Sequence, residues 1–177
     1  MALSVVGPTA AQSTPPAQRF SALAVDLGSP GAATLSIDLS ITRWSTPDER
    51  DAVMNTLLEQ GSSKLLQLLR AMPPVGRLST PGTTGFELRY AARTSAGGTD
   101  RIFLLTDRPV GFWEASAGGR SLDYPFTVVE LRVGPSGQGD GKIVVAAKVS
   151  VDRRTRTITF EDFGISPVLL QNLRRSR

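Results

Sequence analysis

The residues best suited to chemistry lie together, where aromatic, acidic and basic side chains interrupt a long series of strand-like segments. The interruption covers residues 106–114. A second group of such side chains follows at residues 120–124, just before Pro125. In both groups, arginines can bind an anion, carboxylates can act as acid or base, and rings can form an apolar wall. The candidate site residues are Arg108, Trp113, Glu114, Arg120, Asp123 and Tyr124. Apolar walls with a few polar groups are typical of small-molecule sites, so the pattern predicts ligand binding rather than catalysis.

A structural role for the same residues competes with the binding site. Trp113 and Phe112 can instead cover the end of a hydrophobic core, while the nearby charges pair across a loop. The two interpretations differ in one expected result. Alanine at Trp113 weakens ligand binding in the first and abolishes the cooperative thermal transition in the second.

The absence of two residue types excludes several mechanisms. The chain of 177 residues has no His and no Cys, which excludes Ser-His-Asp and Cys-His catalysis, disulfides, and zinc sites with His or Cys ligands. No motif indicates a cofactor or a metal. An enzyme built from this chain must use Asp, Glu, Tyr, Ser, Lys or Arg, and it needs a carboxyl group with a raised pKa.

The charge pattern argues against nucleic acid as a partner. The net charge is +4, and three arginines, Arg174, Arg175 and Arg177, lie at the C-terminus. We expect residues 171–177 to form a solvated basic tail. Aromatic residues make up only 6% of the chain and do not alternate with basic ones. A stacking surface for single-stranded nucleic acid is therefore not expected.

The first 19 residues resemble the end of an export signal followed by a linker. A short apolar run at residues 3–6 precedes small residues and then a Pro-rich segment at residues 13–18. This pattern predicts a disordered N-terminal segment and a secreted or periplasmic protein. No stretch reaches the length of a transmembrane helix. The folded domain is expected to cover residues 20–170.

Strand-like segments and helix start and stop signals define that domain. From Thr34 to Thr42, apolar and polar residues alternate, which is typical of a strand with one buried face. Further strand-like segments cover residues 20–26, 86–91, 101–106, 126–133, 142–151 and 156–163. Helix-start signals at Thr46 and Glu49 and stop signals at Gly61 and Pro73 predict a helical hairpin over about 47–72.

Together these segments predict an α+β fold. We expect a mostly antiparallel sheet of about seven to nine strands, curled or closed into a barrel, with the helical hairpin packed on it. The Gly-rich stretch 134–141 is interpreted as a long hairpin loop. It resembles a phosphate-binding loop only at Gly141 and Lys142, because Ser136 replaces the first required glycine and strands flank the stretch on both sides.

Glu130 and Arg132 form a second, weaker candidate. They lie two residues apart on a predicted strand, so both face the same side as Phe126 and Val128. On a solvated face they are ordinary surface charges, which is the interpretation we favour. Inside a barrel they would need pairing and would become candidates for function.

Two segments carry a resemblance to known proteins. Residues 106–115, TDRPVGFWEA, and residues 123–132, DYPFTVVELR, resemble a group of exported bacterial proteins without a defined activity. The likeness extends over most of the chain from Thr42 onward. It implies export, and it brings no activity, ligand or assigned residues.

The prediction that follows is an exported, non-catalytic β-rich domain whose partner is a small apolar or amphipathic ligand. The ligand body would pack on Trp113, and Arg108 or Arg120 would bind an anionic end. One alternative is a His-independent isomerase or hydrolase in a barrel cavity, with Tyr124 and one of the carboxylates Glu114, Asp123 or Glu130. Another is a structural or assembly module that makes contact through exposed sheet edges or through Leu169 and Leu170.

Overall fold

The computed structural model of the chain describes residues 16–27, 33–108, 126–152, 157–161 and 167–176. The described residues form nine strands and two helices. In chain order these are β1 (Gln18–Asp26), β2 (Ala33–Ile41), α1 (Pro47–Glu59), α2 (Ser62–Ala71), β3 (Gly76–Ser79), β4 (Phe86–Ala96), β5 (Thr99–Thr106), β6 (Phe126–Val133), β7 (Gln138–Asp152), β8 (Thr157–Glu161) and β9 (Val168–Ser176).

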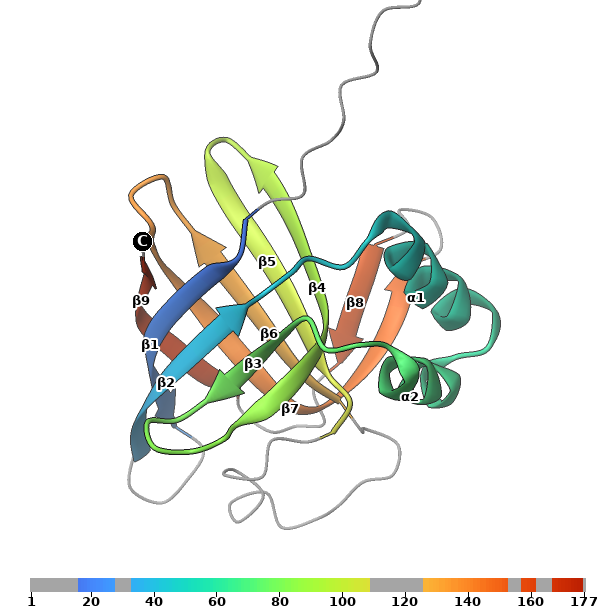
Figure 1. The fold of residues 1–177 in the computed structure, drawn as a ribbon, viewed down its shortest axis with the longest axis horizontal. Helices are drawn as coiled ribbons and strands as arrows, with labels where there is room; N and C mark the ends of the chain where they lie inside the picture. The colour runs from blue at the N-terminus through green and yellow to red at the C-terminus, as the bar shows by residue number, and fades with distance from the viewer. Residues whose placement is uncertain (1–15, 28–32, 109–125, 153–156, 162–166, 177) are drawn as a thin grey trace, which may run out of the picture.

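Eight of the strands close into an antiparallel barrel (Figure 1). Strands β1 to β7 follow one another around the barrel in chain order, and β9 fills the gap between β7 and β1. The pairing of β6 with the first part of β7 completes the ring. The last part of β7 leaves the ring and pairs with β8. The predicted α+β barrel with a meander connection is therefore confirmed, and the sheet closes.

The barrel interior is an apolar core to which every strand of the ring contributes. Side chains alternate between the two faces of each strand, so every second residue faces inward. Large inward residues such as Phe20, Leu39, Leu78, Leu104 and Leu131 are at most 1% exposed and belong to one contiguous cluster. The described part of the interior is thus filled by side chains.

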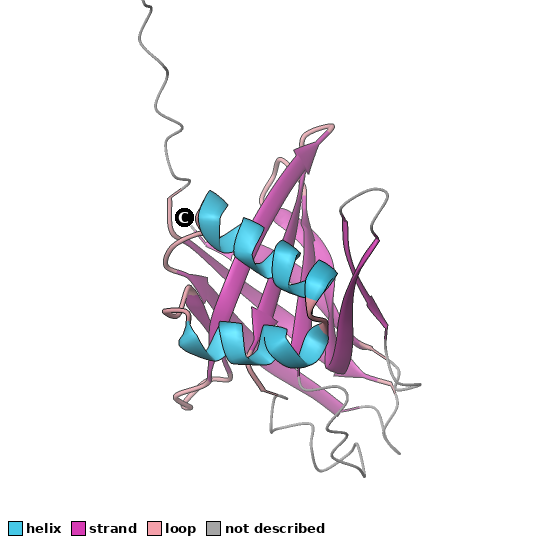
Figure 2. Ribbon diagram, turned by 90° about the vertical axis from the view of Figure 1, so that its right-hand side faces the viewer, coloured by secondary structure: helices cyan, strands magenta, loops and turns pink. Residues whose placement is uncertain are grey.

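A second core lies on the outer face of the barrel, under the helices. Figure 2 shows α1 and α2 side by side across the strands, and they contact β4 and β7. Leu57 and Leu69 from the helices pack on outward residues such as Tyr90 and Phe126. Burial raises the pKa of Tyr90 to about 12. No helix in the described part of the chain is both long and apolar enough to cross a membrane.

The predicted start of the first helix is confirmed atom by atom. Thr46 Oγ1 accepts a hydrogen bond from the Glu49 amide at 3.2 Å, and the Glu49 carboxylate accepts one from the Thr46 amide at 2.8 Å. Arg43 adds two bonds to the same carboxylate, at 2.8 and 2.9 Å. The hydrogen bonds from Arg43, acting against partial burial, hold the pKa of Glu49 below its ordinary value. This network fixes the helical hairpin to the end of β2.

The Gly-rich stretch contains the predicted hairpin connection, but the loop is shorter than predicted. Only residues 134–137 form a turn, because β7 already begins at Gln138. Gly139 and Gly141 are strand residues whose α-carbons lie close to the β6 backbone. A Cβ built on Gly139 would lie 1.8 Å from the carbonyl oxygen of Arg132. These glycines therefore permit close approach of two strands, a role that composition alone does not separate from a loop.

The predictions for the two chain ends also need correction. The expected basic tail from residue 171 is wrong, because residues up to Ser176 belong to β9 and pair with β1 and β7. Leu170 is 1% exposed in the interior core, so it cannot form an external contact. At the other end, β1 begins at Gln18 rather than at residue 20. Finally, β3 lies between the predicted helical hairpin and the predicted strand at 86–91, where the sequence analysis predicts no strand.

Candidate functional site

Of the six predicted site residues, the structure describes only Arg108. Trp113, Glu114, Arg120, Asp123 and Tyr124 lie outside the described residues. The side chain of Arg108 is 60% exposed, and its Nε lies 3.4 Å from Asp107 Oδ1. Arg108 thus places an accessible cation at the end of β5, as an anion-binding role requires.

The neighbouring Asp107 belongs to a buried network that joins the end of β5 to the helices. Its side chain is 7% exposed, and its Oδ2 lies 3.4 Å from Arg89 Nε. Arg89 also pairs with Glu87 at 2.7 Å and donates to the Met72 carbonyl, at the end of α2, at 3.0 Å. Arg89 sits at the irregularity in β4 between Leu88 and Tyr90. The network is a structural clamp between α2 and the barrel.

Buried polar groups gather at this end of the barrel, which we call the Thr106 end. Four of the six buried polar or charged side chains among the described residues lie here: Asp26, Thr106, Asp107 and Thr127. Thr106 Oγ1 accepts a hydrogen bond from the Thr127 amide at 3.0 Å and donates to the Arg108 carbonyl. Strand alternation places Asp26, Thr106 and Thr127 on the inward face. Asp26 lies on β1, across the ring from β5 and β6.

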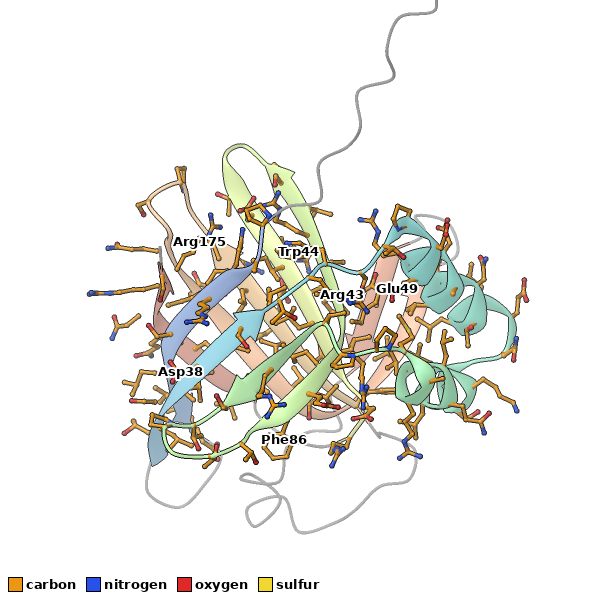
Figure 3. All side chains as sticks on the ribbon, in the orientation of Figure 1. Asp38, Arg43, Trp44, Glu49, Phe86 and Arg175 are labelled. Carbon is orange, nitrogen blue, oxygen red and sulfur yellow. The ribbon has the colours of Figure 1, made fainter. Side chains whose placement is uncertain are left out.

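The opposite end of the barrel is covered by aromatic and ionic contacts. Asp100 Oδ2 accepts a hydrogen bond from Arg175 at 2.7 Å and lies 3.7 Å from Arg93. The two guanidinium groups stack over the rings of Phe20 and Trp44, at 5.7 and 5.5 Å from the ring centroids. Figure 3 shows Trp44 and Arg175 toward this end and Phe86 toward the other. We call this the Trp44 end, and most of its charged groups pair with one another, although Gln18 Oε1 and Arg175 Nε are buried without a hydrogen-bond partner among the described residues.

A third polar cluster surrounds Glu130 on the outer face of the barrel. Glu130 Oε1 accepts a hydrogen bond from Arg101 Nε at 2.8 Å. Arg132 Nε lies 3.7 Å from the same oxygen, and Lys142 Nζ lies 3.4 Å from Oε2. The Glu130 side chain is 3% exposed, whereas those of Arg101 and Arg132 are 58% and 61% exposed. A single buried carboxylate therefore lies beneath three cations.

Charge stabilisation outweighs burial at Glu130. Burial acts to raise the pKa of this carboxyl, but the hydrogen bond from Arg101 and the charges of Arg101, Lys142 and Arg132 hold the pKa below its ordinary value. Of the two interpretations weighed above, the outward orientation is correct, but Glu130 is not an ordinary surface charge. Sequence reasoning missed Arg101 and Lys142 because they come from neighbouring strands.

Glu130 should make the stability of the fold depend on pH. Because its folded-state pKa lies below the ordinary value of 4.5, ionised Glu130 stabilises the fold above that pH. This contribution is lost as the pH falls through the folded-state pKa. We expect Glu130→Gln to lower the free energy of unfolding by about 2 kcal/mol at neutral pH, and by progressively less below about pH 4.5.

Urea denaturation of both proteins across this pH range measures the difference. Asp140→Asn, which changes an exposed carboxylate two strand positions from Lys142, is the matched control and should alter stability by less than about 0.5 kcal/mol. A difference between wild type and Glu130→Gln that stays constant down to about pH 3 would contradict the assignment.

Among the described residues, no group of three or more acidic side chains is placed to hold a metal ion. The comparisons with protein-family models, curated proteins and solved structures found no match to this chain.

Proposed function

We propose that this protein is a non-catalytic binding barrel that holds a small amphipathic ligand across its Thr106 end. The observation that carries the proposal is the asymmetry of the two barrel ends. The Trp44 end is covered by paired charges and aromatic rings, whereas the Thr106 end combines inward polar groups with the exposed cation of Arg108. A few polar groups at the margin of an apolar surface are what orient a small ligand.

The filled interior determines where the ligand lies. Inward side chains from all eight barrel strands pack as one cluster, so the ligand lies across the barrel end rather than deep in the lumen. Its apolar body contacts the end of the core, and its anionic group pairs with Arg108. Trp113, Arg120 and Tyr124 fall between Arg108 and Phe126 in the sequence, and we assign them to the same site on that basis.

Two further parts of the proposal rest on separate grounds. The lowered pKa of Glu130 and its outward position make it unsuited to act as a general acid near neutral pH, which favours binding over catalysis. Export to the periplasm or the medium is proposed from the N-terminal pattern and from the resemblance of residues 106–115 and 123–132 to exported proteins.

Calorimetric titration with dodecanoate, a single-chain anionic amphiphile, tests the binding site. We expect saturable binding to the wild type, and affinity about tenfold weaker for Arg108→Ala, because one charge-assisted contact is lost. Trp113→Ala should also bind more weakly while keeping a cooperative thermal transition. Arg19→Ala, which removes an exposed arginine at the opposite end of the barrel, is the matched control and should bind as the wild type does.

Several outcomes would overturn the proposal. One is the absence of saturable binding by the wild type to both dodecanoate and its neutral analogue dodecanol. Another is equal weakening by Arg108→Ala and Arg19→Ala, which would indicate general electrostatic attraction. Loss of the cooperative transition in Trp113→Ala would identify Trp113 as a core residue and remove it from the site.

A further inference from the structure

The outer-face cluster contains two arginines that repel each other. Arg101 on β5 and Arg132 on β6 are directly opposite in the antiparallel register. Like charges in this arrangement are destabilising unless something lies between them. Glu130 supplies one negative charge to three cations, so its immediate surroundings retain a positive excess.

The three cations are not equivalent. Arg101 donates a hydrogen bond of 2.8 Å to Glu130 and so neutralises it. Arg132 Nε is at 3.7 Å from Glu130 Oε1, beyond hydrogen-bond distance. Within the described part of the chain, the two Nη atoms of Arg132 have no hydrogen-bond acceptor, and the side chain is 61% exposed. Its terminal fork is therefore accessible from solvent.

A hollow lies next to this fork. Its volume is about 150 Å³, and it is lined by Glu130, Arg132, Asp140, Gly141, Lys142 and Leu169. A hollow of this size can take a small organic acid. Together with Arg101, the lining residues Arg132 and Lys142 carry three positive charges, against the two negative charges of Glu130 and Asp140. The excess of one positive charge matches a monoanion.

We propose that this hollow binds the carboxylate group of a small monocarboxylic acid. The planar fork of Arg132 matches a carboxylate through two parallel hydrogen bonds, and the Lys142 ammonium adds charge. Leu169, a partly buried residue that pairs with Lys142 in the sheet, supplies an apolar contact for the carbon body of the acid. The site does not depend on the barrel-end function, because it lies on the outer face of β6, β7 and β9.

Titration with butanoate, followed by NMR through the Gly141 amide and the Leu169 methyl groups, tests this site. We expect saturable shifts of both signals with butanoate and none with butanamide, the neutral isostere. Arg132→Ala should abolish saturation. Arg132→Lys should weaken binding about tenfold, because it keeps the charge but loses the fork. Arg108→Ala, which changes the barrel-end site alone, should show the same butanoate-induced shifts at Gly141 and Leu169 as the wild type.

Three results would overturn the assignment. Equal shifts with butanoate and butanamide would show an apolar contact without carboxylate recognition. Equal shifts with sodium chloride at the same ionic strength would show charge screening only. Unchanged binding by Arg132→Ala, in a protein whose other signals match those of the wild type, would remove Arg132 from the site.

Discussion

Replacing Gly139 with alanine is expected to cost at least about 3 kcal/mol of folding free energy, and in the extreme case to prevent folding. The added Cβ would lie 1.8 Å from the carbonyl oxygen of Arg132 and 2.8 Å from its carbonyl carbon. Both are backbone atoms of the neighbouring strand, so no side-chain rotation relieves the collision. The strands β6 and β7 would have to separate where they close the barrel.

Gly134 is the matched control within the same Gly-rich stretch. The nearest atom to a Cβ built there is the Gln138 carbonyl oxygen at 3.5 Å, which is ordinary contact. We expect Gly134→Ala to change stability by less than about 1 kcal/mol, with a slight gain from the stiffer unfolded chain. Urea denaturation followed by circular dichroism compares the two variants. Equal stability of both would mean that residue 139 lies in a loop, as composition alone suggests.

Arg175→Ala is expected to destabilise the protein by about 2 kcal/mol, whereas Arg174→Ala should cost less than about 0.5 kcal/mol. Arg175 donates a hydrogen bond of 2.7 Å to Asp100 and stacks on Phe20. Burial acts to raise the pKa of Asp100, but the hydrogen bonds from Ser95 and Arg175 hold it below its ordinary value. Arg174 is exposed on the other face of the strand.

Thermal and urea denaturation at neutral pH measure both variants. Because the two arginines are adjacent and equally charged, a change in net charge alone would affect them alike. Equal effects would therefore show that Arg175 contributes only charge and that the Trp44 end does not depend on its pairing with Asp100. A markedly larger effect of Arg175→Ala supports the role of this residue in covering the barrel end.

Local signals in the sequence correctly predicted those elements in which a single residue pattern is unbroken. The alternation from Thr34 to Thr42 gave β2, and the Thr46 and Glu49 pair gave the start of α1, because each signal is complete within a few residues. The strand β9 was missed because it breaks its own alternation. Asn172 adopts a φ of 53° there, and the β1 pairing shifts register nearby, so Leu170 and Leu173 both face inward although they are three residues apart.

The candidate sites show the limit of such signals more clearly. The alternation of side chains along the strand correctly placed Glu130 on the same face as Phe126 and Val128. The burial of Glu130, however, depends on Arg101 and Lys142. These residues meet only after β5, β6 and β7 have paired, and pairing register is a property of the whole sheet. For the same reason, the sequence analysis predicted a solvated C-terminal tail. The pairing of β9 with β1 and β7 also depends on the register of the whole sheet.

The position of β9 also has a consequence for how the chain is made. The first strand, β1, pairs along its length with the last one, β9. The sheet therefore keeps open edges until β9 is available to pair, whether the chain folds during synthesis or after export. Contacts between distant parts of a chain also slow folding, because the intervening loop must be closed first. Chains with unpaired strand edges are prone to associate with one another, so we expect this protein to depend on chaperones until β9 has paired.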